Sequence, residues 1–163
     1  MTTVITARLG ALEADTVLVW TDGACLPNPG AGGWGYLTRH PCGAVTEACG
    51  GEFKTTNNRM ELTAVLEALR ALPAGVKVIV HSDSTYVVYG LQCWRKAWAR
   101  RGWVRKNGNA VPNADLWSAL HQLISAMDTT FVWVRGHSGD VGNQRADVLA
   151  VAGRMAALRD ALA

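Results

Sequence analysis

Long apolar runs are missing from this sequence of 163 residues. No stretch approaches the roughly eighteen apolar residues that a membrane-spanning helix needs. The opening residues 1–15 include Arg8, Glu13 and Asp15, which makes them a poor signal peptide. Cysteine is sparse as well, and the four cysteines form no CxxC pair and no zinc-type spacing. These absences indicate a cytoplasmic protein with free thiols.

Acidic residues are absent from residues 86–114. The net charge of the whole chain is only +3, and outside this window the acids outnumber the bases. The cations of the window are Arg95, Lys96, Arg100, Arg101, Arg105 and Lys106. Such an uneven distribution is typical of a protein that binds a polyanion.

Residues 17–53 are expected to form an antiparallel meander of three strands. The first half of residues 17–30 is β-branched and aromatic, and turn-forming residues follow it. Two more strands are predicted over Trp34–Thr38 and Val45–Phe53, with short turns between them.

Helical spacing begins after the capping residues of Thr55–Asn58, and one face carries Leu62, Val65, Leu66, Leu69 and Leu72. The remaining predicted elements are a strand over Val76–Ser82, a helix from Ser84–Tyr86, a helix from Asn113 or Asp115, a strand over Thr129–Val134 and a helix over about Val141–Leu158. Because Val76–Ser82 is almost continuously apolar, we expect a parallel strand that is covered on both faces.

Four acidic residues need an explanation beyond local structure: Asp22, Glu61, Asp83 and Asp147. Asp22 follows a predicted strand, and no Lys or Arg lies between Arg8 and Arg39 to pair with it nearby. Glu61 shares a helix face with apolar residues, so it is predicted to point inward. Each acid has a local alternative: a turn residue, a helix-dipole partner, an N-cap and a solvated side chain, respectively.

Gathered carboxylates repel one another unless divalent cations neutralise them. A ligand set of oxygen atoms alone favours Mg²⁺ or Mn²⁺ over zinc. Two such ions roughly 3.5–4 Å apart can stabilise both the attacking and the leaving oxygen of a phosphodiester. The four acids therefore predict a two-metal site.

The motifs around these acids are Thr21-Asp22-Gly23 with Asn28-Pro29-Gly30, Thr55 through Glu61, Ser82-Asp83-Ser84 with Tyr86, and Gly136-His137-Ser138-Gly139 with Asn143 through Asp147. In this order, over about Val17–Met155, they closely resemble bacterial-type ribonuclease H type 1. The resemblance implies an α/β protein with the ribonuclease H-like fold, a mixed five-stranded sheet of three antiparallel strands followed by parallel strands, and helices on both faces. It also implies Mg²⁺-dependent endonucleolytic cleavage of the RNA strand of RNA–DNA hybrids, leaving 3′-hydroxyl and 5′-phosphate ends.

The resemblance carries over to named residues. It implies that Asp22, Glu61, Asp83 and Asp147 bind the metals and that His137 assists proton transfer or product release. Predicted substrate contacts beside the metals are Cys25, Asn28, Thr56, Asn57, Asn58 and Thr85. A basic protrusion over residues 92–106 supplies Trp94, Arg95, Lys96, Trp98, Arg100, Arg101 and Trp103. Three positions depart from the family: Pro27 replaces a common Gly, Thr85 a common Gln and Gln144 a common Glu.

One catalytic domain is expected over residues 16–158, between a short N-terminal tail at 1–15 and a C-terminal tail at 159–163. We expect a cytoplasmic monomer that acts on hybrid duplexes, and the resemblance implies a role in DNA replication. Two alternatives stay open: a binding module that kept the fold without the chemistry, and a related nuclease such as a junction resolvase or a transposase-like enzyme. The four acids and His137 argue against the first, and residues 55–61 with the basic protrusion argue against the second.

Overall fold

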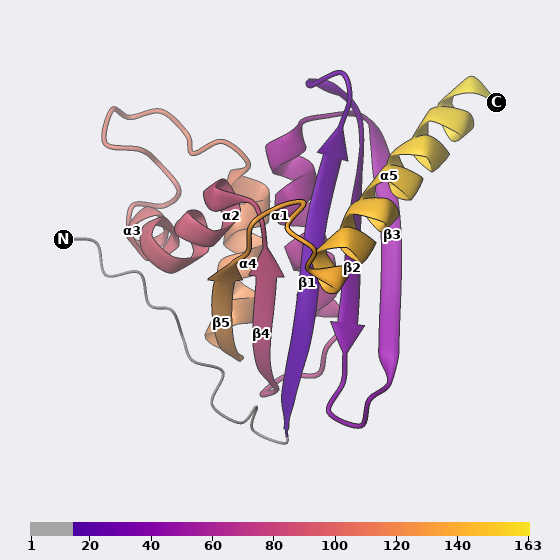
Figure 1. Cartoon of the computed structure of the whole chain (residues 1–163). Coiled ribbons are helices and arrows are strands. Elements are labelled where there is room, and N and C mark those ends of the chain that lie inside the picture. Colours follow the sequence, from indigo (N-terminus) through magenta and orange to yellow (C-terminus); the bar gives the residue numbers. More distant parts are fainter. Residues whose placement is uncertain (1–14) are drawn as a thin grey trace.

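The computed structural model describes residues 15–163, so all of the predicted N-terminal tail except Asp15 lies outside the described residues. A five-stranded sheet with the order β3-β2-β1-β4-β5 forms the centre of the protein (Figure 1). Its strands are β1 (Thr16–Cys25), β2 (Gly30–Arg39), β3 (Val45–Thr55), β4 (Lys77–Ser82) and β5 (Asp128–Trp133). The first three pair antiparallel, whereas β4 is parallel to both β1 and β5. The predicted mixed sheet is confirmed.

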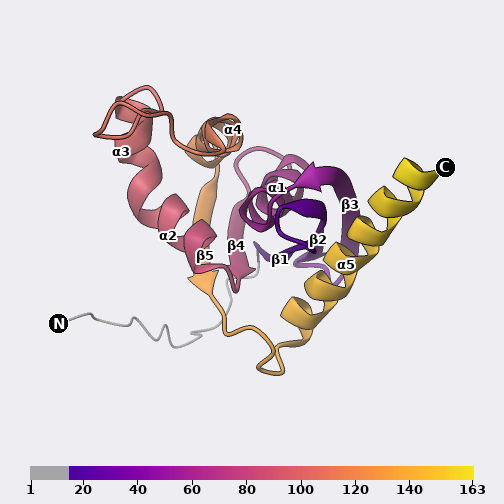
Figure 2. The ribbon, with the colours of Figure 1, turned by 90° about the horizontal axis from the view of Figure 1, so that it is seen from above.

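Helices cover the two faces of the sheet unequally (Figure 2). Helices α1 (Asn57–Arg70) and α4 (Ala114–Ser125) lie on one face, and α5 (Val141–Leu162) crosses β1, β2 and β3 on the other. A continuous segment of α2 (Thr85–Tyr89), the π-helix η1 (Gly90–Trp94) and α3 (Arg95–Arg100) projects beyond the parallel strands. No helix among residues 15–163 is long and apolar enough to cross a membrane.

The prediction that the fourth strand is covered on both faces was wrong for one face. Burial alternates along β4: Val78, Val80 and Ser82 are buried, whereas the residues between them are partly exposed. The physical reason is that α5 packs over the antiparallel half of the sheet. On the less covered face, His81 stacks on Trp20 with their ring centroids 4.9 Å apart.

The main core lies between the sheet and α1 with α4. All five predicted apolar positions of α1 and the turn after it, Leu62, Val65, Leu66, Leu69 and Leu72, are buried there. Trp117 and Leu120 of α4 are fully buried against them. Each such side chain contributes about 1.5–3 kcal/mol through burial, so this layer holds α1 firmly against the sheet.

Several elements extend beyond their predicted ends. Strand β2 starts at Gly30 rather than Trp34, and α5 continues to Leu162, so the predicted C-terminal tail is largely helical. Tertiary packing explains the first difference, because a Cβ on Gly33 would overlap the backbone of Ala150 and Arg154 in α5. The glycine-rich start of β2 therefore lets the backbone of α5 pack directly against the sheet.

Candidate active site

Three carboxylates meet where β1, β4 and α1 come together. Asp22 lies in β1, Asp83 directly follows β4, and Glu61 lies in α1, and one carboxylate oxygen of each falls within 4.8 Å of the others. Because β1 and β4 are parallel neighbours, with Thr21 opposite Ser82, the residues that follow these two project at the same edge of the sheet.

Gly23 brings the third carboxylate into this group. A Cβ at Gly23 would lie 2.7 Å from the carbonyl carbon of Met60 and would overlap the amide nitrogen of Glu61. Only a residue without a side chain lets the backbone of α1 approach β1 this closely. The missing Cβ therefore allows Glu61 to sit beside Asp22.

The electrostatics of the group are unfavourable without a cation. Asp22 is 7% exposed, and its pKa is raised to about 7. Burial is the largest cause of this rise, and the charge of Asp83 is the second. The Gly23 amide donates a hydrogen bond of 2.8 Å to Asp22 Oδ1 and partly opposes this rise. The pKa of Glu61 is raised well above its usual value, mainly by burial and secondly by the charges of Asp22 and Asp83.

Glu61 also carries an orphaned oxygen, because its buried Oε2 has no hydrogen-bond partner. An unpartnered buried carboxylate oxygen is costly. A divalent cation would satisfy this oxygen and offset the repulsion among the three acids. The donor set, which consists of carboxylate oxygens only, therefore fits a hard cation.

Asp147 lies beside this group rather than within it. It is half-buried in the second turn of α5 and is not among the three acids whose oxygens lie within 4.8 Å. Its charge contributes to the raised pKa of Asp22, so the two carboxylates interact electrostatically. The structure thus brings three of the four predicted acids together and places the fourth at their margin.

His137 lies on the exposed loop between β5 and α5, and its backbone φ of 54° is left-handed. The residue before it, Gly136, packs against the carboxylate cluster: a Cβ there would lie 2.8 Å from Asp83 Oδ2. The loop therefore starts in contact with the acids and carries His137 out into solvent.

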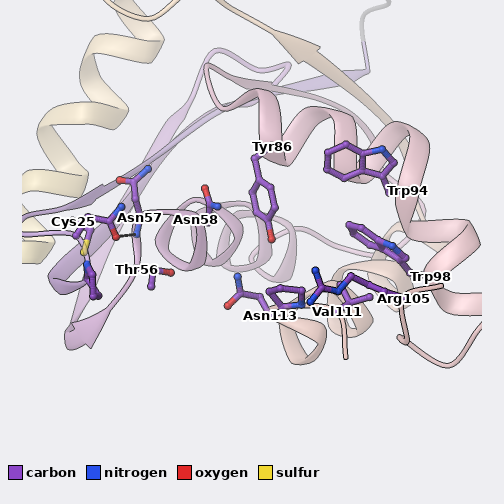
Figure 3. A pocket seen from close by; sticks show the side chains of 13 residues that line it. Cys25, Thr56, Asn57, Asn58, Tyr86, Trp94, Trp98, Arg105, Val111 and Asn113 are labelled. Carbon is purple, nitrogen blue, oxygen red and sulfur yellow. Dashed lines mark hydrogen bonds between the residues drawn. The ribbon is translucent and has the colours of Figure 1, made fainter. Parts of the chain in front are cut away.

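A groove of about 880 Å³ is lined by the β1–β2 loop, the start of α1 and the segment α2–α3 (Figure 3). Its predicted members are Cys25, Asn28, Thr56, Asn57, Asn58, Trp94 and Trp98. Asn28 Oδ1 accepts a hydrogen bond of 3.1 Å from the Asn57 amide, which ties the β1–β2 loop to the start of α1. Figure 3 shows Asn57 and Asn58 toward one end, Trp94 and Trp98 toward the other, and Tyr86 between them.

Sequence reasoning missed Pro29, Tyr86, Val111, Pro112 and Asn113 as lining residues of this groove, and it named Arg105 only as a cation of the basic window. Tyr86 belongs to a recognised motif, and its hydroxyl accepts a hydrogen bond from Trp117 Nε1. Asn113 precedes α4 with a left-handed φ of 58° and makes no side-chain capping bond. Its position next to a helix start predicts a cap, so the sequence held no signal for a place in the groove.

Six predicted substrate residues lie outside this groove: Thr85, Arg95, Lys96, Arg100, Arg101 and Trp103. The cations Arg95, Lys96 and Arg100 line a second groove of about 720 Å³ between α3 and α4, together with His121.

Arg95 is held within this second groove. Its Nε donates to Leu91 O at 2.9 Å, and its guanidinium lies 3.0 Å from His121 Nδ1. Trp103 packs edge-on against His121. Segment η1–α3 therefore turns its tryptophans toward one groove and its cations toward the other.

The sheet order and the acids at its edge define the ribonuclease H class of fold, which is shared with LC9-RNase H1, described as a type 1 RNase H with the type 2 active-site motif. That structure matches with a TM-score of 0.78 and 35% identity over 90% of this chain and 75% of that one. LC11-RNase H1, solved in complex with RNA/DNA hybrid, matches with a TM-score of 0.66 and 23% identity over 87% of this chain and 99% of that one, which shows the fold alone.

Closer relatives specify the family. The family model named RNase H matches residues 14–155. The Ribonuclease H of Hyphomonas neptunium is 50% identical over 138 residues, which cover 85% of this chain and 91% of that protein. The Ribonuclease H of Bordetella pertussis is 49% identical over 148 residues, 91% of this chain and 95% of that protein. The chain belongs to the RNase H family, and it is a ribonuclease H enzyme.

Proposed function

We propose that this enzyme hydrolyses the RNA strand of RNA–DNA hybrids endonucleolytically, with two Mg²⁺ ions and with Mn²⁺ as a substitute. The products carry 3′-hydroxyl and 5′-phosphate ends. The observation that carries the proposal is the group of three carboxylates within 4.8 Å, of which Asp22 and Glu61 are buried. Residues 16–158 form the catalytic domain, with residues 92–106 as its basic protrusion.

Asp22, Glu61 and Asp83 would hold the cations, with Asp147 at the margin of the same site. Magnesium ions bound there would supply an activated water and stabilise the leaving oxygen of the phosphodiester. Burial of Asp22 and Glu61 keeps bulk water away from two of the ligands. In a site of this kind the charges act in a low dielectric, where they are worth more than in water.

His137 assists the transfer of a proton to the leaving 3′-oxygen, or it assists the departure of the product. Its loop starts at Gly136, in contact with Asp83, and its ring is exposed. A titratable group on such a loop can reach a phosphodiester that lies over the acids without being buried among them.

The groove of Figure 3 binds the hybrid in this proposal. Short polar side chains beside the acids, Asn28, Thr56, Asn57 and Asn58, contact the minor groove and can test for the 2′-hydroxyl that distinguishes RNA from DNA. Cys25 lines the same groove, and Thr85, which lies outside it, is a further substrate contact in this proposal. Trp94, Trp98 and Trp103 with the cations Arg95, Lys96, Arg100 and Arg101 hold the duplex outside the cleavage site.

The test is digestion of one labelled RNA that is annealed to DNA, annealed to RNA, or left single-stranded, with and without Mg²⁺. We expect cleavage only of the DNA-annealed RNA and only with the metal. Asp22→Asn should abolish cleavage while the protein stays folded. The control is Asp128→Asn, which changes an exposed acid at the start of β5 and should leave cleavage normal.

Two results would contradict the proposal. Hybrid binding without cleavage in either Mg²⁺ or Mn²⁺ would favour a binding module. Cutting of branched DNA in preference to the hybrid would favour a junction-specific nuclease.

The proposed monomeric state is tested by sedimentation of the same preparation, and the proposed cytoplasmic location by fractionation of cells.

A further inference from the structure

Asn143 is a buried amide that the proposed chemistry leaves unused. It lies in the first turn of α5 and is only 4% exposed. Its backbone N–H donates to Oδ1 of the N-cap residue Asp140 at 2.9 Å, so the start of the helix is fixed at this point. Its side-chain Nδ2 lies 3.4 Å from Asp83 Oδ2, whereas its Oδ1 is buried without a partner.

This arrangement is unfavourable for a residue that only packs. A buried polar atom without a partner costs about 1–3 kcal/mol, and an apolar side chain of the same size would avoid that cost. The benefit must therefore lie in the group that the amide faces. That group is Asp83, one of the three acids of the cluster.

Asp83 is held by the same chain segment at two further points. Trp133 Nε1 donates a hydrogen bond of 3.0 Å to the backbone carbonyl of Asp83. Gly136 lies so close that a Cβ there would be 2.8 Å from Asp83 Oδ2. Residues 133–143 thus surround Asp83 with a backbone anchor, a close packing contact and an amide donor, which we call the Asp83 cradle (Trp133, Gly136 and Asn143).

We propose that Asn143 is a positioning residue that orients the Asp83 carboxylate for cation binding, with Trp133 as its backbone anchor. This inference rests on the proposed metal-dependent function and adds residues to it. Asp22 and Glu61 are fixed by burial, but Asp83 is only half-buried and needs partners to hold its orientation. Groups that hydrogen-bond a metal ligand typically change metal affinity 10–100-fold when they are replaced.

The proposal is tested by calorimetric titration of Mg²⁺ and Mn²⁺ into the metal-free protein. Asn143→Leu keeps the number and branching of the side-chain heavy atoms but removes the donor, and we expect cation binding about tenfold weaker. The KM for the hybrid should stay near the wild-type value, and raising the Mg²⁺ concentration should restore most of kcat. The matched control is Gln122→Leu on the exposed face of α4, which should bind the cation as the wild type does.

A second variant tests the anchor even if Asn143→Leu does not fold. Trp133 is 50% exposed, so Trp133→Phe is tolerated while it removes the indole N–H. We expect two- to fivefold weaker cation binding, with Trp34→Phe on β2 as the control.

The outcomes separate the two proposals. Cation affinities equal to the wild type in both cradle variants would overturn the role of the cradle and leave the proposed function standing. A lowered melting temperature with unchanged affinity would likewise reduce Asn143 to a structural residue. A wild-type protein that binds neither metal would overturn the metal-dependent function itself.

Discussion

The carboxylate cluster and the groove beside it place their side chains in opposite environments. Asp22 and Glu61 are 7% and 4% exposed, whereas Trp94 at the far end of the groove is 40% exposed. In the cluster a few groups are buried at an energetic cost and depend on one another. In the groove, every lining residue except Val111 is at least partly exposed to solvent. We therefore expect single changes to be severe in the cluster and graded in the groove.

The largest effect should follow Glu61→Gln. This change keeps the shape of the side chain but removes a charge from the site, and charge stabilisation by a metal supplies several kcal/mol to such reactions. We expect kcat to fall on the order of a thousandfold, measured with a labelled hybrid. Glu67→Gln, on the outer side of the same helix, serves as the control, and equal losses in both variants would contradict the assignment.

The next effect is a gain rather than a loss: Asp22→Asn should raise the stability of the metal-free protein. The pKa of Asp22 is raised to about 7 in the folded protein, above 3.8 in the unfolded chain. Its contribution to stability is therefore complete below about pH 4 and is lost as the pH rises through 7. In EDTA at pH 8, Asp22→Asn should unfold about 5–10 °C higher than the wild type, since it removes a penalty of a few kcal/mol.

Thermal melts at pH 8 and pH 4 check this prediction. The gain should vanish at pH 4, where the wild-type carboxyl is protonated. It should also shrink when saturating Mg²⁺ stabilises the wild type alone. A variant that melts below the wild type in EDTA at pH 8 would show that Asp22 is not under electrostatic strain.

A smaller effect is expected in the groove. Trp94→Ala removes a stacking surface worth about 1–3 kcal/mol per base, so the KM for the hybrid should rise about tenfold with little change in kcat. Phe53→Ala changes a comparably exposed aromatic residue on β3, away from the groove, and provides the matched control. A loss confined to kcat would place Trp94 in the chemistry and remove the distinction between the two regions.

The smallest effect concerns salt. Lys96→Ala and Arg100→Ala should each weaken hybrid binding only a few-fold in low salt. If each cation contacts a phosphate, the slope of log K against log salt should fall by about 0.9 per residue, the value for B-DNA. Arg159→Ala near the end of α5 should leave the slope unchanged. An unchanged slope in Lys96→Ala and Arg100→Ala would place the second groove outside the path of the duplex.

Much of the fold could be predicted because periodicity and capping are local signals. Thr56 caps α1 by accepting from the Arg59 amide, and the five predicted leucine and valine positions are buried. The error at β4 arose because a hydrophobic run does not show which part of the sheet its covering helix crosses. The early start of β2 depends on glycines whose use appears only when α5 lies on them.

The candidate site divides in the same way. Motifs and family resemblance pointed to all four acids and to His137, and the structure gathers Asp22, Glu61 and Asp83 while placing Asp147 beside them. The direction in which a side chain faces on α3 could not be predicted from the sequence, and only the structure shows that Arg95 bonds Leu91 O and faces His121. Asn113 and Tyr86 were missed because their place in the groove depends on elements distant in the sequence.

By itself, the sequence determined the succession of strands and helices along the chain, the acid-free window and which four acids are candidate metal ligands. Each of these depends on residues that are close together in the chain. Only the tertiary structure decided how far each acid is buried, which oxygen lacks a partner and which residues surround Asp83. Those properties come from close contacts among β1, β4, α1 and the start of α5, which are far apart in the chain and meet only when the sheet is packed.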